Sequence, residues 1–425
     1  MEPTKQVKKV AIIGYNRIPF ARQNTAYTEA TNQDMMTAAL AGLIERYNLK
    51  GELLGEVVGG AVIKHSSERN LMRECVLGTS LDPATPACDL QQACDTGIEA
   101  VVYIANKIAL GQIEVGISGG VDSTSNVPVV VNAHFRKILL AANRAKTGGA
   151  KLKQFLKIRP KDLVPVVPQG GEPRTGLSMG GHTEFTAKYY GISREEQDLF
   201  SLESHQKMAK AYDEGFFKDM ITPYMGLERD NNLRRDSSLE KLAKLKPAFD
   251  KVNGSLTAGN STPFTDGASC VLLASEEWAA KHNLPVLAYV TFAEVAAIEY
   301  VQNKHNLLLA PVYASNRMLR KAGLKLQDFD FYEIHEAFAA QVLATLKIWE
   351  SADLSKAFGF EPLGKIDRTK LNVKGSSLAA AHPFAATGGR VIATMAKLLH
   401  QKGSGKGFIS ICAAGGQGVT MILEK

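Results

Sequence analysis

The segment from Ala381 to Leu423 reads AHPFAATGGRVIATMAKLLHQKGSGKGFISICAAGGQGVTMIL, and it decides the predicted fold. A turn of small residues at 385–389 precedes apolar residues at helical spacing over 391–399. A glycine-rich break at 403–407 follows, and then an apolar run at 408–411. Turn, helix, break and strand in this order indicate an α/β unit whose helix packs on a sheet.

A second passage, which begins at Cys94, has the same order. Apolar residues over 98–109 follow helical spacing, Gly111 ends the helix, and a strand is predicted at 115–118. Cys94 precedes the first of these helices as His382 precedes the second. We therefore predict an α/β fold made of two duplicated halves, with helices packed on a mostly parallel or mixed sheet.

The stretch between the two passages differs in composition. It is long and polar, and prolines and glycine pairs interrupt it, which predicts an inserted domain of helices and loops. We expect an N-terminal half at 1–125 that is completed by 256–285, an inserted loop domain at 126–255, and a C-terminal half at 286–425.

The inserted stretch carries a basic segment from Arg136 to Lys161 that contains no acidic residue. Such a segment is typical of a solvated basic face, of a site for an anionic ligand, or of a surface that meets a membrane or a partner protein. The sequence leaves these three interpretations open.

Composition narrows the class of protein. The chain has 425 residues, of which 45% are apolar and 22% charged, as in an ordinary globular protein. Its five cysteines show no paired spacing, which argues against a disulfide framework or a zinc ribbon and favours a reducing, cytoplasmic setting. A net charge of +7 favours polyanionic partners without naming one. No apolar run approaches the roughly 18 residues that cross a bilayer, and the N-terminus lacks a signal sequence, so we expect a soluble protein.

Cys94 is a candidate nucleophile because of its place before a helix. A free cysteine titrates near 8.5, and the positive end of a helix favours the thiolate. The alternative is a small buried apolar residue, which is what we expect of Cys75, Cys88 and Cys270.

Three further motifs carry reactive side chains. Cys412 opens a glycine-rich turn that leads into a strand, so the turn does not suit a dinucleotide site, whose glycines precede a helix. Its free amides suit an oxyanion instead. His335 and Glu336 start an apolar helix, but Ala339 stands where a zinc protease has its second histidine. His382, by itself, is as consistent with a structural histidine as with a base.

Taken together, these motifs resemble the thiolase family from Lys9 to the C-terminus. The resemblance rests on five motifs in the family's order: Cys94-Asp95-Thr96-Gly97, Thr257 to Thr262 with Asp266-Gly267-Ala268, His335-Glu336-Ala337-Phe338, His382-Pro383-Phe384, and Cys412 to Gly418. His335, where many relatives have asparagine, together with the basic insertion, is most similar to thiolase subunits of fatty-acid β-oxidation complexes.

The resemblance implies a five-layered α/β/α/β/α fold and thiolytic cleavage of 3-ketoacyl-CoA, with coenzyme A as co-substrate and no metal or bound cofactor. His382 would activate the nucleophile Cys94, and Cys412 would act as acid and base. One oxyanion hole would use His382 and a water held by His335, and the other would use the amides of Cys94 and Ala414. Arg234 and Thr262 are the residues that we expect to bind coenzyme A.

Two residues depart from the family's pattern. Asp95 follows the nucleophile, where a carboxylate disfavours a thiolate, and Ala381 stands where the family usually has glycine. These departures leave open a non-catalytic thiolase-fold subunit that binds acyl-CoA or scaffolds a complex. An acetoacetyl-CoA thiolase that works in the condensing direction is another alternative. A ketoacyl synthase fits less well, because those enzymes lack the second cysteine.

The resemblance also implies partners. They are a second copy or three further copies of the chain, in a homodimer or homotetramer, and a β-oxidation α-subunit with hydratase and dehydrogenase activity. Peripheral contact with a membrane is a further expectation, which comes from the basic segment. We expect no nucleic-acid partner.

Overall fold

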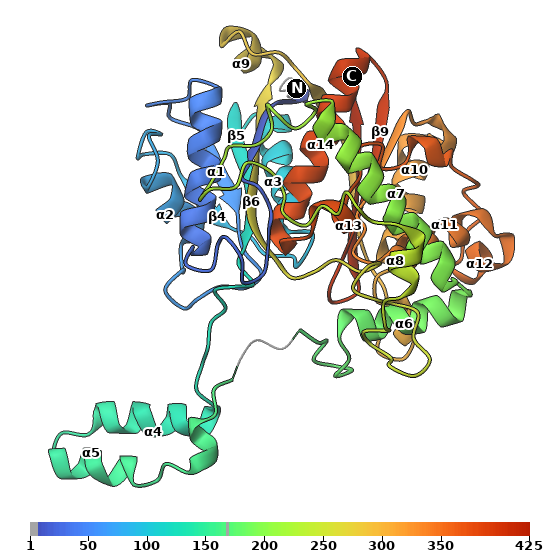
Figure 1. Cartoon of the computed structure of the whole chain (residues 1–425). Helices are drawn as coiled ribbons and strands as arrows, with labels where there is room; N and C mark the ends of the chain where they lie inside the picture. Colours follow the sequence, from blue (N-terminus) through green and yellow to red (C-terminus); the bar gives the residue numbers. More distant parts are fainter. Residues whose placement is uncertain (1–6, 167–169) are drawn as a thin grey trace, which may run out of the picture.

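The computed structural model describes residues 7–166 and 170–425, and these form a mixed sheet covered by helices on both faces (Figure 1). Residues 1–6 of the predicted N-terminal half and 167–169 of the predicted inserted domain lie outside the described residues. The strand order is β4-β3-β5-β6-β1-β7-β10-β9-β8, and the short β2 pairs with β6. The strands are β1 (Val10–Arg17), β2 (Ala21–Arg22), β3 (Glu56–Gly59), β4 (Ala87–Asp89), β5 (Val115–Asp122), β6 (Thr265–Ser275), β7 (Ala288–Ala297), β8 (Phe331–Ile334), β9 (Lys406–Ala413) and β10 (Gln417–Glu424).

The sheet consists of two similar parts that meet at β1 and β7. Strands β3 with β4, β3 with β5, and β8 with β9 are parallel, whereas the central pairs are antiparallel. The junction is short, because β1 pairs with β7 only over Val10 to Ile12. The predicted strands at 115–118 and 408–411 are present as parts of β5 and β9, and the strand predicted after the turn at Cys412 is β10.

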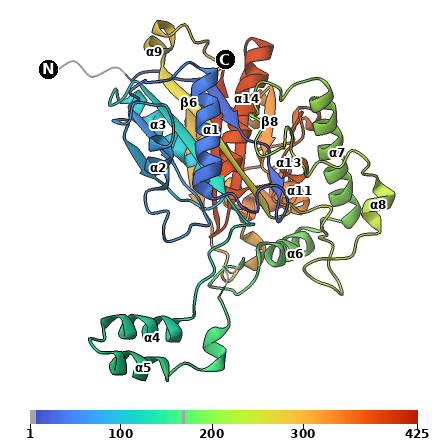
Figure 2. The same cartoon turned by 60° about the vertical axis from the view of Figure 1, so that its left-hand side comes forward.

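Helices and sheet alternate in layers (Figures 1 and 2). Helices α1 and α2 pack on the outer face of the N-terminal part, and α10 packs on the outer face of β7, β9 and β10 with α11 beside it. Helices α3 and α14 lie against each other between the two parts of the sheet. The bounds of these helices are α1 (Asn32–Arg46), α2 (Leu71–Leu77), α3 (Thr96–Ala109), α10 (Ala310–Ala322), α11 (Ala339–Glu350) and α14 (Thr387–Lys402).

The central layer forms because the two halves present apolar helix faces to each other. The helical spacing seen in the sequence buries Ile98, Val101 and Ile104 of α3 with Val391 and Met395 of α14 in one core cluster. Fully burying one such side chain contributes about 1.5–3 kcal/mol, so this layer is a main source of stability.

The starts of α3 and α14 touch backbone to backbone. A methyl group at Gly388 would lie 2.2 Å from the backbone nitrogen of Ile98, and one at Gly97 would lie 2.5 Å from the carbonyl oxygen of Ala385. Only glycine fits at these positions, because no Cβ is accommodated that close to another backbone. The turns that precede the two helices are thereby brought together.

The helices of the chain between β5 and β6 are joined by long loops. Helices α4 and α5 form a hairpin that projects away from the layered core (Figures 1 and 2). Paired backbone hydrogen bonds between Val130 and Val166, of 2.9 and 2.7 Å, close its base. These helices fall in the range predicted for the inserted domain, although the domain division itself stays a prediction. The helices of this stretch are α4 (Ala133–Arg144), α5 (Gly148–Phe155), α6 (Met179–Tyr190), α7 (Arg194–Asp213) and α8 (Leu239–Ala243).

Short helices complete the fold. They are α9 (Glu276–Lys281), α12 (Ala352–Ala357) and α13 (Ser377–Ala380), with single 3₁₀ turns at η1 (Pro160–Leu163), η2 (Lys304–Asn306), η3 (Leu326–Asp328), η4 (Arg368–Lys370) and η5 (Phe384–Ala386). Over 7–166 and 170–425, none of the helices combines the length and the apolar character needed to cross a membrane.

Replacing Gly388 by alanine tests the helix contact. The added methyl group forces the starts of α3 and α14 apart, and overpacking of this kind costs typically about 1–3 kcal/mol. We expect the urea unfolding midpoint to fall accordingly. Gly149→Ala is the control, because Gly149 lies in exposed α5 with nothing within 4 Å of its added methyl group, and it should cost no stability. Equal midpoints for Gly388→Ala and the parent protein would contradict this account.

Candidate active site

Cys94 and His382 face each other where the two helix starts meet. Nε2 of His382 lies 3.2 Å from Sγ of Cys94. On the other side of the ring, Nδ1 lies 2.5 Å from the hydroxyl oxygen of Thr387, and the amide of His382 donates to the hydroxyl of Thr265 at 3.3 Å. A thiol and an imidazole at hydrogen-bond distance, with the imidazole held from behind, are the arrangement of a nucleophile with its base.

Burial keeps this pair neutral at rest. It raises the pKa of the Cys94 thiol to about 12, with a further upward contribution from Asp95, whereas the amides of Ala414 and Cys94 act in the opposite direction. Burial and then the charge of Arg390 lower the pKa of His382 to about 3. The expectation that the start of a helix favours a resting thiolate is therefore wrong here, because desolvation outweighs the helix.

Asp95 is the residue that was expected to repel a thiolate. Its side chain is fully buried, and neither carboxyl oxygen has a hydrogen-bond partner within the described residues. Burial raises the pKa of Asp95 well above its usual range, so that the neutral acid is the stable form. The neighbour of the nucleophile thus brings little negative charge to the site.

Cys412 lies on the same cavity near the end of β9 and is 2% exposed. Burial raises its pKa well above the usual range, and a negative charge on Cys94 or Asp95 would raise it further, so it too is a thiol at rest. A residue distant in the chain holds the turn that follows Cys412, because the amide of Gly415 donates to the carboxylate of Glu172 at 2.7 Å. This anchoring fixes the position of the Ala414 amide beside Sγ of Cys94.

His335 packs behind His382, and the centres of the two rings are 4.2 Å apart. Its amide donates to the carbonyl of Ser410, which continues the β8–β9 pairing. Glu336 anchors the same turn by accepting hydrogen bonds from Ser204, from Asn372 and from the amide of Leu378. Nδ1 of His335 lies 2.7 Å from the hydroxyl oxygen of Ser377, whereas Nε2 has no partner among the residues that the structure describes.

A cavity of about 310 Å³ opens over the two cysteines and His382. Its wall is mostly apolar, with Met179, Phe249, Phe264, Phe338 and Phe384 around the reactive groups. Such a cavity suits a long, thin, largely apolar ligand whose reacting end reaches Cys94.

Comparisons with known proteins agree with this geometry. The family model described as "Thiolase, N-terminal domain" matches residues 10–277, and the one described as "Thiolase, C-terminal domain" matches residues 285–425. The chain belongs to the thiolase family. The predicted family is thus confirmed.

Named thiolases match the chain over nearly its whole length. It is 42% identical to a 3-ketoacyl-CoA thiolase of Yersinia pestis (strain Pestoides F) over 429 aligned residues, which cover 99% of this chain and 98% of the relative. A crystal structure of the Bacillus anthracis acetyl-CoA acetyltransferase has a TM-score of 0.83 at 29% identity and covers 99% of this chain and 100% of that one. Human mitochondrial 3-ketoacyl-CoA thiolase has a TM-score of 0.79 at 28% identity, with 98% and 99% covered. The predicted thiolase fold is confirmed.

Of the two residues predicted to bind coenzyme A, one lines the cavity and the other does not. Thr262 lines the cavity, although its hydroxyl already donates to the carbonyl of Ala337 at 3.0 Å. Arg234 is exposed and is not one of the lining residues, but burial and then the charge of Arg234 lower the pKa of Arg22, which does line the cavity. Asp266 is buried and accepts from the amides of Thr124 and Ser125, so it secures a neighbouring turn. The roles of Arg234 and Thr262 stay predictions.

Several residues of the site were not predicted from the sequence. Arg22 belongs to no recognisable motif, and Phe249 and Phe264 lie in loops whose positions depend on the whole fold. Phe384 belongs to the predicted His382-Pro383-Phe384 motif, although no place in the cavity wall was predicted for it. Ser377, which contacts His335, lies only five residues before His382 but carries no pattern of its own.

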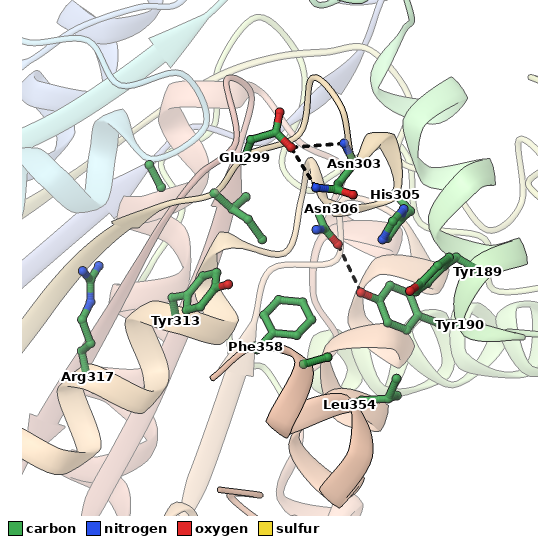
Figure 3. A pocket seen from close by; sticks show the side chains of 13 residues that line it. Tyr189, Tyr190, Glu299, Asn303, His305, Asn306, Tyr313, Arg317, Leu354 and Phe358 are labelled. Carbon is green, nitrogen blue, oxygen red and sulfur yellow. Dashed lines mark hydrogen bonds between the residues drawn. The ribbon is translucent and has the colours of Figure 1, made fainter. Parts of the chain in front are cut away.

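A second cavity of about 530 Å³ lies elsewhere, between α6, α10, α12 and the loop that follows β7. Figure 3 shows the rings of Tyr313 and Phe358 on one side of it, with Asn306 and Tyr190 joined by a hydrogen bond of 3.2 Å. It is larger than the first cavity, but neither cysteine of the predicted site lines it, and its histidine, His305, stacks on Tyr189. The thiol chemistry belongs to the smaller cavity.

Ala381, directly before His382, has a backbone conformation that favours glycine. Its φ is +77° and its ψ is −179°. In this region a side chain costs about 1–3 kcal/mol, because the Cβ crowds the neighbouring carbonyl groups. The glycine that the family usually carries at this position would meet no such penalty. Ala93, directly before Cys94, also has a positive φ, of +46°.

Ala381→Gly tests this strain. Glycine at position 381 relieves the backbone strain of about 1–3 kcal/mol. The larger entropy of glycine in the unfolded chain partly offsets this gain, so we expect the free energy of unfolding to rise by about 1 kcal/mol. Ala380→Gly is the matched control, because Ala380 is helical and buried, and that change should destabilise. Urea titrations measure both. A loss of stability in Ala381→Gly would show that the turn tolerates alanine without strain.

Proposed function

We propose that this chain catalyses the thiolytic cleavage of 3-ketoacyl-CoA by coenzyme A, which yields acetyl-CoA and a shortened acyl-CoA in fatty-acid β-oxidation. The observation that carries the proposal is the 3.2 Å contact between Cys94 and His382, with Cys412 on the same cavity. Full-length similarity to a 3-ketoacyl-CoA thiolase at 42% identity supports the same substrate class.

In the first half of the reaction, Sγ of Cys94 attacks the 3-keto carbon while His382 takes the thiol proton. Because the thiol has a raised pKa and the imidazole a lowered one, free charge separation is unfavourable, and proton transfer accompanies bond formation. The bond between C2 and C3 then breaks. Its electron pair leaves as the enolate of acetyl-CoA, and the acyl group stays on Cys94 as a thioester.

Cys412 completes the first half and starts the second. As a buried thiol of raised pKa, it holds the proton that the enolate carbon needs. The resulting Cys412 thiolate then deprotonates the incoming coenzyme A. The thiolate of coenzyme A attacks the acyl-Cys94 thioester, and the shortened acyl-CoA leaves, while the proton held by His382 returns to Cys94.

Two oxyanions form along this path. The amides of Cys94 and Ala414, which already act on Sγ of Cys94, are suited to the tetrahedral intermediates. His382 and a water held by His335 are suited to the thioester enolate. Losing one donor of an oxyanion hole costs about 3–4 kcal/mol of transition-state stabilisation. The loss of any one of these donors is therefore large enough to measure in the rate.

The alternatives fit less well. A non-catalytic subunit was suggested by Asp95 and Ala381, yet Asp95 is neutral by burial and Ala381 keeps the turn that orients His382. Condensation of two acetyl-CoA molecules would use the same residues in reverse, and the similarity to an acetyl-CoA acetyltransferase favours it as the second candidate. We place thiolysis first because the 3-ketoacyl-CoA thiolase of Yersinia pestis is 42% identical to this chain, whereas the acetyl-CoA acetyltransferase is 29% identical.

Arg22 and Arg234 are the groups suited to the phosphates of coenzyme A. Arg22 lines the cavity, and the charge of Arg234 acts on it, so the two guanidinium groups lie near each other. The family resemblance supports a homodimer or homotetramer and an α-subunit partner. The five cysteines, all free in the described structure, support a reducing compartment such as the cytoplasm.

The Cys412→Ser variant tests the separate roles of the two thiols. Cys94 should still accept an acetyl group from acetyl-CoA, because this step uses Cys94, His382 and the amides. Cleavage of 3-ketoacyl-CoA should fall by about 10²-fold or more, because a hydroxyl is a far weaker acid and base than a thiol. Mass spectrometry of the Cys94 peptide and loss of acetoacetyl-CoA absorbance measure the two activities. Acylation found only on Cys412 of the parent protein would reverse the assignment.

For the α4–α5 hairpin we propose contact with an anionic membrane surface. The basic segment carries exposed apolar side chains beside its lysines, among them Leu140, Leu152 and Leu156, which are 48%, 61% and 78% exposed. The nearest acidic residue, Asp162, is buried and already bonded to Arg159 and His134. Basic and apolar groups that share one projecting surface are typical of binding to lipid headgroups.

Replacing Lys151, Lys153 and Lys157 by glutamine should weaken sedimentation with vesicles that contain anionic lipid. The attraction should also fall with added salt, since charges are screened beyond about 8 Å at physiological ionic strength. Cleavage of short substrates should stay unchanged, because none of these lysines lines the catalytic cavity. Replacing Lys241, Lys244 and Lys246 near α8 is the matched control. Equal binding by the first variant and the parent protein would leave the segment as a solvated basic face.

A further inference from the structure

Ser377, at the start of α13, joins His335 to a buried arginine. Its hydroxyl oxygen lies 2.7 Å from Nδ1 of His335 and accepts a hydrogen bond of 2.8 Å from Nη2 of Arg390 in α14. All three side chains are buried. We propose that Arg390 and Ser377 are positioning residues that fix the tautomer of His335, so that its Nε2 always carries the hydrogen and donates it at the active site.

The direction of each hydrogen bond follows from what each group can do. A guanidinium only donates, so Ser377 must be the acceptor in its bond with Arg390. The serine hydrogen then needs an acceptor of its own, and Nδ1 of His335 is the one found among the described residues. Nδ1 is therefore unprotonated, and in a neutral imidazole the hydrogen resides on Nε2.

Arg390 makes one further hydrogen bond, from Nη2 to the hydroxyl of Ser376 at 3.2 Å. Burial lowers the pKa of Arg390, and the carboxyl groups of Glu333 and Glu336 act in the opposite direction from β8 and the following turn. A guanidinium with a lowered pKa is still protonated at neutral pH, so it remains a donor. Burial lowers the pKa of His335 well below its usual range. The charges of a protonated His382 and of Arg390 act in the same direction. His335 is thus a neutral donor and not an acid or base.

The Nε2 hydrogen of His335 has no acceptor within 7–166 and 170–425, although the residue is fully buried. A buried N–H without a protein partner is costly unless a water or a substrate atom accepts from it. His382 lies beside it, with ring centres 4.2 Å apart. A water that accepts from Nε2 keeps both of its hydrogens for an enolate oxygen, whereas a water that must donate to Nε2 keeps one. This step rests on the proposed function, because the enolate arises only where the carbon–carbon bond is broken or, in reverse, formed.

Ser377→Ala with Ser376→Ala as matched control tests the proposal. Both serines accept from Arg390, but only Ser377 contacts His335. In Ser377→Ala we expect kcat for acetoacetyl-CoA cleavage to fall about 10-fold to 100-fold, less than outright loss of an oxyanion donor, with KM little changed. Exchange of labelled coenzyme A into acetyl-CoA, which passes through acetyl-Cys94 and forms no enolate, should persist. Ser376→Ala should keep both activities, and thermal unfolding verifies that each variant is folded.

Nitrogen NMR gives a readout that a purely structural role would not change. The chain contains nine histidines, and a His335→Asn variant identifies the His335 signals in protein labelled with ¹⁵N-histidine. The parent protein and Ser376→Ala should show the tautomer with hydrogen on Nε2. Ser377→Ala should show a mixture or the other tautomer.

The outcomes separate the two levels of the argument. If the parent protein cleaves no 3-ketoacyl-CoA, the proposed function fails, whereas the NMR result still decides the tautomer. If the parent protein is active but Ser377→Ala keeps the same tautomer and the same kcat, the positioning role is wrong. An equal loss of exchange and cleavage in Ser377→Ala would mean a general disturbance of the site and would also overturn the proposal.

Discussion

The active site depends on the close contact between the starts of α3 and α14. Gly97 and Gly388 leave no room for a side chain between the two backbones. That contact joins the two halves of the chain, and it is why a cysteine from one half and a histidine from the other stand 3.2 Å apart. A reactive pair divided between two halves in this way exists only when both halves are folded and packed, so stability and catalysis share one constraint.

Burial then determines the chemistry of that pair. Cys94 and Cys412 have raised pKa values and His335 and His382 have lowered ones, so these four groups are neutral at rest. Charge arises only when substrate is present and donors are already in place. Because those donors are backbone amides on anchored turns and side chains held from behind, little reorganisation is needed as the charge develops.

The residues that orient the reactive groups are as informative as the groups themselves. Ala93 and Ala381 each have a positive φ directly before Cys94 and His382, so both reactive side chains leave the backbone from an unusual turn. Ser377, Thr387 and Glu336 hold the histidines and their turns. The projecting α4–α5 hairpin is separate from all of this, since its exposed basic and apolar surface lies away from the layered core.

The sequence by itself determined the class of fold, the duplicated order of helix and strand, the family, and Cys94, His335, His382 and Cys412 as candidates, because these follow from periodicity and from motifs that are local in the chain. It did not determine which charges the site carries. Asp95 is a carboxylate in the sequence and a neutral acid once buried, and the helix before which Cys94 stands does not overcome desolvation. Nor did it supply Arg22, Phe249 or the contact of Ser377 with Arg390 and His335. Burial and contacts between distant segments are properties of the packed structure, and only the tertiary structure decides them.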